Sequence, residues 1–201
     1  MKTVLKGGNA AAMLRVALEK GESLSIAQDS VVACSDSLSF SGRSDGGILI
    51  KLARRFSRGN FKYQEITALA PDQWIMLAPE MAGGAVAIEL QHFGAIIMEE
   101  RAFLAASPDV VISRKIKKLE EIGIDSIQLS GKGTAHFSGA GAIEAMALLP
   151  EQSVLVATDH LVAFEAHIPC KNPENGMVKM TGPGLVWLQT RRMMGPLAGA
   201  E

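Results

Sequence analysis

Three segments of the chain share one pattern of apolar and polar positions. In each, an apolar stretch is followed by two to four polar or small residues and then by an apolar pair and an alanine. The three align without gaps and are ESLSIAQDSVVACS (22–35), GAIIMEERAFLAAS (94–107) and QSVLVATDHLVAFE (152–165). Short β-branched runs interrupted by Asp, Glu, Gln and Thr are typical of a strand, a tight turn and a second strand. The pattern therefore predicts three copies of one strand–turn–strand unit.

A glycine pair leading into an apolar run follows each of these segments. The runs are DGGILIKLARR (45–55), GKGTAHFSGAG (131–141) and GPGLVWLQTRR (182–192). Glycine permits the positive φ or the close backbone approach that a corner of a sheet requires. Alternation along the last run places Val186 and Leu188 on one face of the strand. Trp187 falls on the opposite face with Leu185 and Gln189, where we expect it to close a core or an interface.

The remaining segments complete the predicted architecture. Local propensity favours helix in AAAMLRVALEKG (10–21) and SRKIKKLEEIG (113–123). No Pro/Ser-rich linker or low-complexity tract divides the 201 residues. We therefore predict one compact, all-β domain over residues 1–201. It would be a pseudo-threefold β-sandwich or barrel of three related β units, at about 10–70, 71–140 and 141–195.

Composition restricts the class of protein. Hydrophobic residues make up 48% of the chain, which is ordinary for a globular protein. The net charge of −1 excludes a globally basic nucleic-acid binder, and 5% aromatic residues leave few platforms for stacking on single strands. No run approaches the roughly 20 apolar residues of a membrane helix, and no signal-peptide pattern is present. We expect a cytoplasmic protein without a nucleic-acid partner.

The histidines are the first candidates for a metal site. HLVAFEAH (160–167) contains His160, Glu165 and His167, but strand alternation places His160 on the face opposite the other two. His92 and His136 stand alone in other parts of the chain. Because zinc or iron needs three or more convergent ligands, we predict structural histidines, with no metal and no other cofactor.

Nucleophilic and nucleotide-binding motifs are incomplete. Cys34 and Cys170 lack metal spacing and a convincing basic partner in sequence, and the glycine-rich turn around Ser138 lacks the G-x-S-x-G pattern. In GKGTAHFSGAG, His136 stands where a phosphate-binding G-x-G-x-x-G loop has its third glycine. The sequence therefore assigns no catalytic or nucleotide-binding residue.

Basic clusters offer an anion-contacting surface. If the three repeats surround an axis, Arg55 and Arg192 fall on related surfaces and, with Arg54 and Arg191, form a positive rim. Such a rim would meet phosphate or anionic lipid. The alternative is solvated charge that balances the 21 acidic residues.

The run GPGLVWLQTRR, with LPEQSVLVATDHLVAFE and MLAPEMAGG before it, resembles the altered-inheritance-of-mitochondria family. The resemblance extends from MLRVALEKGESL to the twin arginines. It implies a β-rich fold like that of the trp RNA-binding attenuation protein, with pseudo-threefold internal repetition, and a strand in place of the helix over 10–21. It brings no characterised reaction, and the RNA binding of a fold relative does not transfer with the fold. Eukaryotic members look mitochondrial, but no targeting segment here supports that location.

These observations lead to one main functional hypothesis and two alternatives. The main hypothesis is a non-enzymatic binding or scaffold protein that forms a homo-oligomer, because strand-rich bodies must manage unpaired edges. One alternative is a small-molecule or metal-dependent enzyme with a pocket in the β body. The other is a binder of anionic surfaces, lipid or nucleic acid, through the arginine rim.

Overall fold

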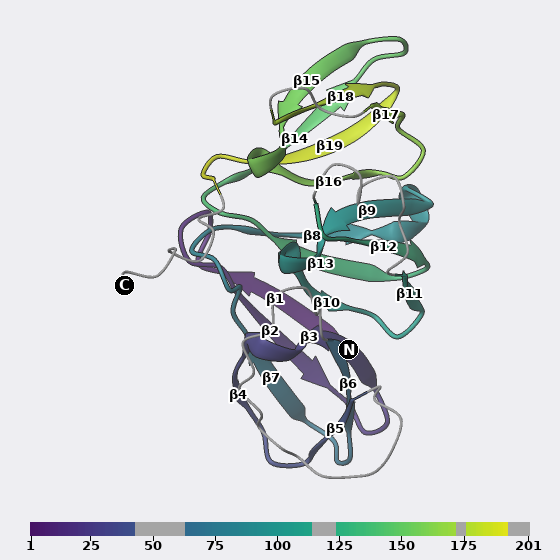
Figure 1. The fold of residues 1–201 in the computed structure, drawn as a ribbon. Helices are drawn as coiled ribbons and strands as arrows, with labels where there is room; N and C mark the ends of the chain where they lie inside the picture. Colours follow the sequence, from purple (N-terminus) through teal and green to yellow (C-terminus); the bar gives the residue numbers. More distant parts are fainter. Residues whose placement is uncertain (43–62, 114–123, 172–175, 193–201) are drawn as a thin grey trace.

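The structure is a computed structural model that describes residues 1–42, 63–113, 124–171 and 176–192. Throughout these residues the regular elements are β-strands and short 3-10 turns, so the all-β prediction is confirmed. Figure 1 shows the strands arranged as tiers of a tall stack. No helix in the described ranges has the length and apolarity that crossing a bilayer requires.

The strands fall into three sets of six after an initial strand, β1 (Lys2–Lys6). Unit 1 contains β2 (Met13–Leu18), β3 (Ser23–Ala27), β4 (Val31–Cys34), β5 (Leu38–Gly42), β6 (Tyr63–Ala68) and β7 (Gln73–Leu77). Unit 2 contains β8 (Ala85–Glu89), β9 (Ala95–Glu99), β10 (Phe103–Ala106), β11 (Val110–Ser113), β12 (Ser126–Gly131) and β13 (Thr134–Ser138). Unit 3 contains β14 (Ile143–Leu148), β15 (Ser153–Ala157), β16 (Leu161–Glu165), β17 (Cys170–Lys171), β18 (Met177–Thr181) and β19 (Gly184–Gln189).

The described strands form four antiparallel sheets with one recurring order. Their orders are β1-β2-β7-β4, β5-β6-β3-β10-β13-β8, β11-β12-β9-β16-β19-β14 and β15-β18-β17. Each six-stranded sheet therefore passes from one unit into the next, through the pair β3·β10 or β9·β16. In Figure 1, β4 and β5 lie at the bottom of the stack and β15 at the top.

A buried apolar cluster fills each unit. In unit 1, alternate residues of β2 point into the cluster: Leu14, Val16 and Leu18 are buried, whereas Arg15 and Ala17 are exposed. This alternation explains why the segment over 10–21 is a strand despite its helical propensity. β2 pairs with β1 on one side and β7 on the other, and pairing with burial outweighs local preference. The helix predicted over 113–123 lies outside the described residues except for Ser113, which ends β11.

The three aligned sequence segments have the same local structure, as their shared pattern predicts. Each consists of a strand, a 3-10 turn and a second strand, the turns being η1 (Gln28–Ser30), η3 (Glu100–Ala102) and η4 (Thr158–His160). The second strand of each has a register shift just before its alanine, which is Ala33, Ala105 or Ala163. Such a bulge redirects the strand at the same point in every unit.

Strand pairing shows which strands hold equivalent places in the three units. β10 pairs with β13 and β16 with β19, so the glycine runs at 131–141 and 182–192 hold equivalent places. In unit 1 that place belongs to β7, which pairs with β4, while the run at 45–55 lies outside the described residues. β7 thereby joins the first set of strands, beyond the limit near residue 70 that the sequence suggested. The division into three repeats at the proposed boundaries stays a prediction.

Candidate functional site

Adjacent units join through two antiparallel strand pairs with the same register, which we call the inner seams. In the first seam Ala105 of β10 lies opposite Ile26 of β3. In the second, Ala163 of β16 lies opposite Met98 of β9. The two alanines hold the same place in the aligned segments, and so do Ile26 and Met98. The chain thus makes the same contact twice.

Each inner seam exchanges apolar side chains between neighbouring cores. Leu104 of unit 2 is 1% exposed and packs into the cluster of unit 1. Val162, its equivalent in unit 3, is 1% exposed and packs into the cluster of unit 2. In the other direction, Ile97 of unit 2 is 5% exposed and packs into the cluster of unit 3. The units are therefore continuous in packing as well as in hydrogen bonding.

Trp187 contributes to the second seam. Its side chain is 3% exposed and packs with the cluster of unit 2, although β19 belongs to unit 3. The indole meets the rings of Phe93 and Phe137 edge-on, with centroids 5.5 and 5.7 Å away, a favourable geometry for aromatic pairs. Val186, on the other face, packs into the cluster of unit 3. The two-faced strand and the interface role of Trp187 are both confirmed.

At each end of the stack, one strand that is equivalent to a seam strand has an unpaired edge. β4 is one of the two edges of the first sheet, and β15 is one of the two edges of the last. Val32 on β4 is 55% exposed, although its equivalents Leu104 and Val162 are buried. Leu155 on β15 is 65% exposed, although its equivalent Ile97 is buried. Large apolar side chains are thus exposed on both strands, and Figure 1 shows β4 and β15 at opposite ends of the stack.

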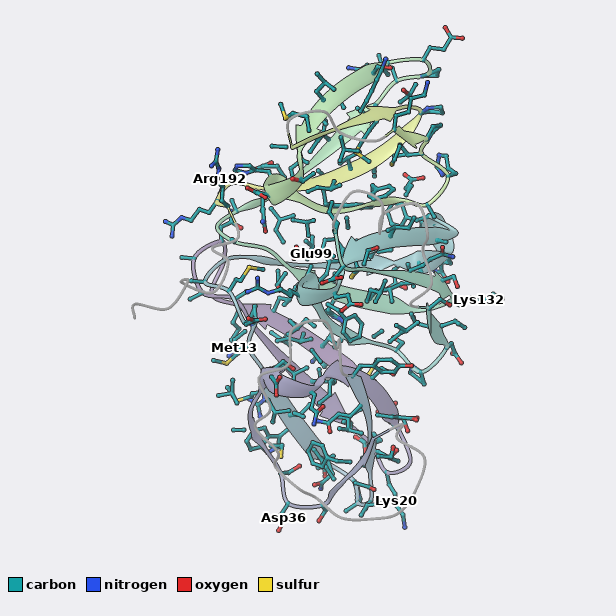
Figure 2. All side chains as sticks on the ribbon, viewed as in Figure 1. Met13, Lys20, Asp36, Glu99, Lys132 and Arg192 are labelled. Atoms are coloured by element: carbon teal, nitrogen blue, oxygen red, sulfur yellow. The ribbon has the colours of Figure 1, made fainter. Side chains whose placement is uncertain are left out.

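A second surface lies where the connections between units meet. An open cleft of about 350 Å³ is lined by Gly7, Asn9, Ala10, Ala82, Gly141, Ala142, Thr190 and Arg191. Of the predicted arginine rim, Arg191 and Arg192 are exposed beyond the end of β19, whereas Arg54 and Arg55 lie outside the described residues. Figure 2 shows Arg192 on one side of the stack and Lys132 on the opposite side.

Tight backbone packing builds this cleft. The Gly84 amide donates to the Gly141 carbonyl at 2.7 Å, and a Cβ added at Gly83 would lie 1.9 Å from the Gly139 carbonyl oxygen. The Arg191 amide donates to the Ala140 carbonyl at 3.1 Å, so it is already engaged. An anion in the cleft would therefore depend on the guanidinium groups. Neither Arg191 nor Arg192 forms an ion pair with the described part of the chain.

The histidines singled out by the sequence make local contacts. His167 Nδ1 lies 3.3 Å from Glu165 Oε2, which agrees with their predicted common face, and His167 Nε2 lies 3.0 Å from the Pro183 carbonyl oxygen. His160 Nδ1 lies 2.7 Å from the carbonyl oxygen of Gln189. Over the described ranges, no three His, Cys, Asp or Glu residues converge as metal ligands would.

The remaining candidate nucleophiles also make structural contacts. Cys34 and Cys170 are half-buried and form no disulfide within the described residues, and the Cys170 thiol donates to the Ile168 carbonyl at 3.6 Å. The Ser138 hydroxyl is buried and donates to the Ala102 carbonyl at 3.3 Å. The Ser138 hydroxyl thus bonds to the backbone at the end of η3, and no basic side chain among the described residues is hydrogen-bonded to it.

His136 has an environment that the sequence did not indicate. Its side chain is 1% exposed, and neither ring nitrogen has a hydrogen-bond partner among the residues that the structure describes. Burial lowers the pKa of His136 to about 4, although the charge of Glu89 acts in the opposite direction. By register, His136 on β13 corresponds to Trp187 on β19 and to Met76 on β7. It therefore holds a position that is apolar in the other two units.

Glu99 is the second unforeseen titratable group. It ends β9 in the middle of the stack (Figure 2), and burial raises its pKa to about 7. The Arg101 charge opposes this rise, while the carboxylates of Glu80, Asp125 and Asp159 add to it. Arg101 is itself held by Glu80, at 2.9 Å between Nη2 and Oε1. The sequence MEER gave no sign of this environment, because the strands that bury Glu99 come from distant segments.

Comparisons with known proteins agree with this architecture. A solved structure of a protein from Streptococcus pyogenes superposes with a TM-score of 0.78 at 20% identity, covering 96% of this chain and 94% of that one. At this identity the likeness concerns the fold alone. No curated protein matches the sequence. The family model described as "Mitochondrial biogenesis AIM24" matches residues 4–191, which include all three units. The chain therefore belongs to the mitochondrial biogenesis AIM24 family.

Proposed function

We propose that this protein is a self-associating, non-enzymatic scaffold whose copies join through the ends of the stack. One observation supports this proposal above the others. β4 and β15 are unpaired edges that carry exposed Val32 and Leu155, whereas the strands equivalent to them in the other units are paired and buried. An exposed apolar edge is a template for pairing with another chain, so proteins normally cover it or protect it with charge.

The mass of the protein in solution tests self-association. We expect light scattering to give a multiple of 21.3 kDa for the wild-type protein at micromolar concentrations. Val32→Asp places a charge on the exposed edge and should reduce the mass to that of one chain. The matched control is Val111→Asp, because Val111 is 58% exposed on β11, an edge strand elsewhere in the stack. A wild-type mass of one chain at all concentrations would refute the scaffold.

A second candidate function is supported by the arginines at the end of β19. Arg191 and Arg192 are exposed beside an open cleft and have no carboxylate partner among the described residues, as a surface for phosphate or anionic lipid would require. We do not propose an enzymatic activity, because no arrangement in the described ranges favours one.

Sedimentation with lipid vesicles tests this second function. We expect more protein to pellet with vesicles containing phosphatidylserine than with neutral ones, and less at high salt. Arg191→Ala with Arg192→Ala should abolish the difference. Lys20→Ala with Lys132→Ala is the control of equal charge, since both lysines are exposed. Equal pelleting with both kinds of vesicle would exclude the anionic surface.

A further inference from the structure

The free edges at the two ends of the stack correspond to the two halves of an inner seam. β3 and β9 each supply one side of a seam, and in unit 3 the strand in that place is β15. β10 and β16 each supply the other side, and in unit 1 the strand in that place is β4. The described strands therefore form two complete seams. The two strands equivalent to the halves of a seam, β4 and β15, are unpaired at opposite ends of the stack.

We propose that β15 of one copy pairs with β4 of the next copy, antiparallel and in the register of the inner seams. Val156 then lies opposite Ala33, as Met98 lies opposite Ala163. Leu155 lies opposite Cys34, as Ile97 lies opposite Phe164. This inference rests on the proposed scaffold function and adds to it the pair of strands, their direction and their register.

The exposed side chains fit this pairing. In the inner seams, Leu104 and Val162 pack into the core of the preceding unit. Val32, 55% exposed, would do the same in unit 3 of the neighbouring copy. Ile97 packs into the core of the following unit, and Leu155, 65% exposed, would do so in unit 1 of the next copy. Burial of these two side chains removes apolar surface from water at both ends of the contact.

The other sheet edges differ from β4 and β15 in one respect. β5, β11 and β17 hold the same place in the three units, and each is an edge. β8 and β14 are likewise edges in units 2 and 3, and in unit 1 the equivalent strand β2 is covered by β1, which is the edge at that place. Their exposure is therefore a regular feature of the unit. β4 and β15 are edges although their equivalents, β10 and β16 for β4 and β3 and β9 for β15, are paired across the inner seams.

The contact must be between different copies. β4 and β15 lie at opposite ends of the stack, so one chain does not bring them together (Figure 1). A contact between two different surfaces is head-to-tail, and its repetition gives a closed ring or an open filament, according to the rotation at each step. The series of units would then continue without interruption from copy to copy.

Disulfide trapping tests the register, because Cys34 already occupies one side of the proposed seam. In a Cys170→Ser background, Leu155→Cys places a second thiol opposite Cys34 of the neighbouring copy. Directly opposed strand residues have Cβ atoms about 4.5–5.5 Å apart, close enough for a disulfide after a small adjustment. We expect mild oxidation to give reducible ladders of linked chains. Pairing raises the effective concentration of the two thiols, so the rate of linking should be at least about ten times that of the Leu149→Cys control described next.

Two control variants make the result specific. Leu149→Cys in the same background keeps Cys34 and puts a thiol at an equally exposed position, 68% against 65% for Leu155. Adding Cys34→Ser to Leu155→Cys removes the proposed partner and should abolish the ladder. Linking that is as fast in Leu149→Cys, or that persists without Cys34, would overturn the register.

The mass of each variant under reducing conditions separates this inference from the scaffold proposal. Multimers that fail to link through Cys34 and the thiol introduced at position 155 would refute the seam but leave self-association standing. A single-chain mass for all the proteins, without linking, would refute both.

Discussion

Ala163 lies directly opposite Met98 across the second inner seam, in the register that Ala105 and Ile26 form across the first. The alanine comes just after a bulge in both strands. A small side chain at this point lets large residues on either side reach the neighbouring core, as Val162 does. The recurring alanine in the sequence thus marks the contact between units.

Trp187→Ala should strongly weaken the second seam. The indole fills the junction between units 2 and 3 against Phe93 and Phe137, so its removal leaves a cavity there. We expect a loss of about 3–5 kcal/mol in the free energy of unfolding, measured by urea denaturation. Trp74→Ala is the control, since Trp74 is half-buried under the Arg15 guanidinium and should cost less. Equal losses would contradict the role of Trp187 in the seam.

His136→Met should remove a source of acid sensitivity. The pKa of His136 is about 4 in the folded protein and 6.5 ordinarily, so between these values only the unfolded chain holds the proton. Stability due to this group is present above pH 6.5 and is lost as the pH falls towards 4. Methionine is uncharged and occurs at the equivalent position in β7, Met76. The variant should lose less stability than the wild-type protein on acidification.

The same substitution should also raise stability at pH 7, by about 1 kcal/mol, because it removes two buried nitrogens that lack a hydrogen-bond partner in the described part of the chain. Thermal melts between pH 4 and 8 would measure both effects. His92→Met is the control, because His92 is exposed. The burial argument fails if His136→Met and the wild-type protein have parallel pH profiles.

Glu99→Gln should change the stability of the protein at neutral and higher pH, whereas the effect of His136→Met appears on acidification. The pKa of Glu99 is about 7 in the folded protein and 4.5 ordinarily, so between these values only the folded chain holds the proton. Stability due to this group is present below pH 4.5 and is lost as the pH rises through 7. Glutamine stays neutral, so the variant should exceed the wild-type stability above pH 7, by up to about 3 kcal/mol.

Denaturation at pH 5 and pH 8 would measure this difference. The control is Glu144→Gln, because Glu144 is exposed on β14 and its neutralisation should change little. A Glu99→Gln variant that gains nothing between pH 5 and pH 8 would show that the folded protein tolerates the charge at this position.

The sequence predicts the local structure of the units better than their contacts. The strand–turn–strand pattern and the two faces around Trp187 follow from apolar alternation, which depends on neighbouring residues alone. The equivalence of β7 with β13 and β19 does not follow, because β7 lacks the glycine pair and begins after Asp72, a non-glycine residue at a φ of 55°. Pairing between distant strands decides that equivalence.

The candidate site was least accessible to sequence reasoning. Val32 and Leu155 have the same residue character as their buried equivalents, so only the position of their strands in the stack reveals their exposure. Glu99 and His136 likewise depend on strands brought together from different units. The arginine rim was predicted from charge, and Arg191 and Arg192 are indeed exposed, while the other half lies outside the described residues.

Amide hydrogen exchange in β4 and β15 tests end-to-end pairing most directly. If copies join through these strands, their outward amides should exchange in the wild-type protein about as slowly as those of β9 and β10. In Val32→Asp, both strands should lose this protection together, whereas the inner seams should keep theirs. Rapid exchange at β4 and β15 in the wild-type protein, at concentrations where it is multimeric, would contradict the account.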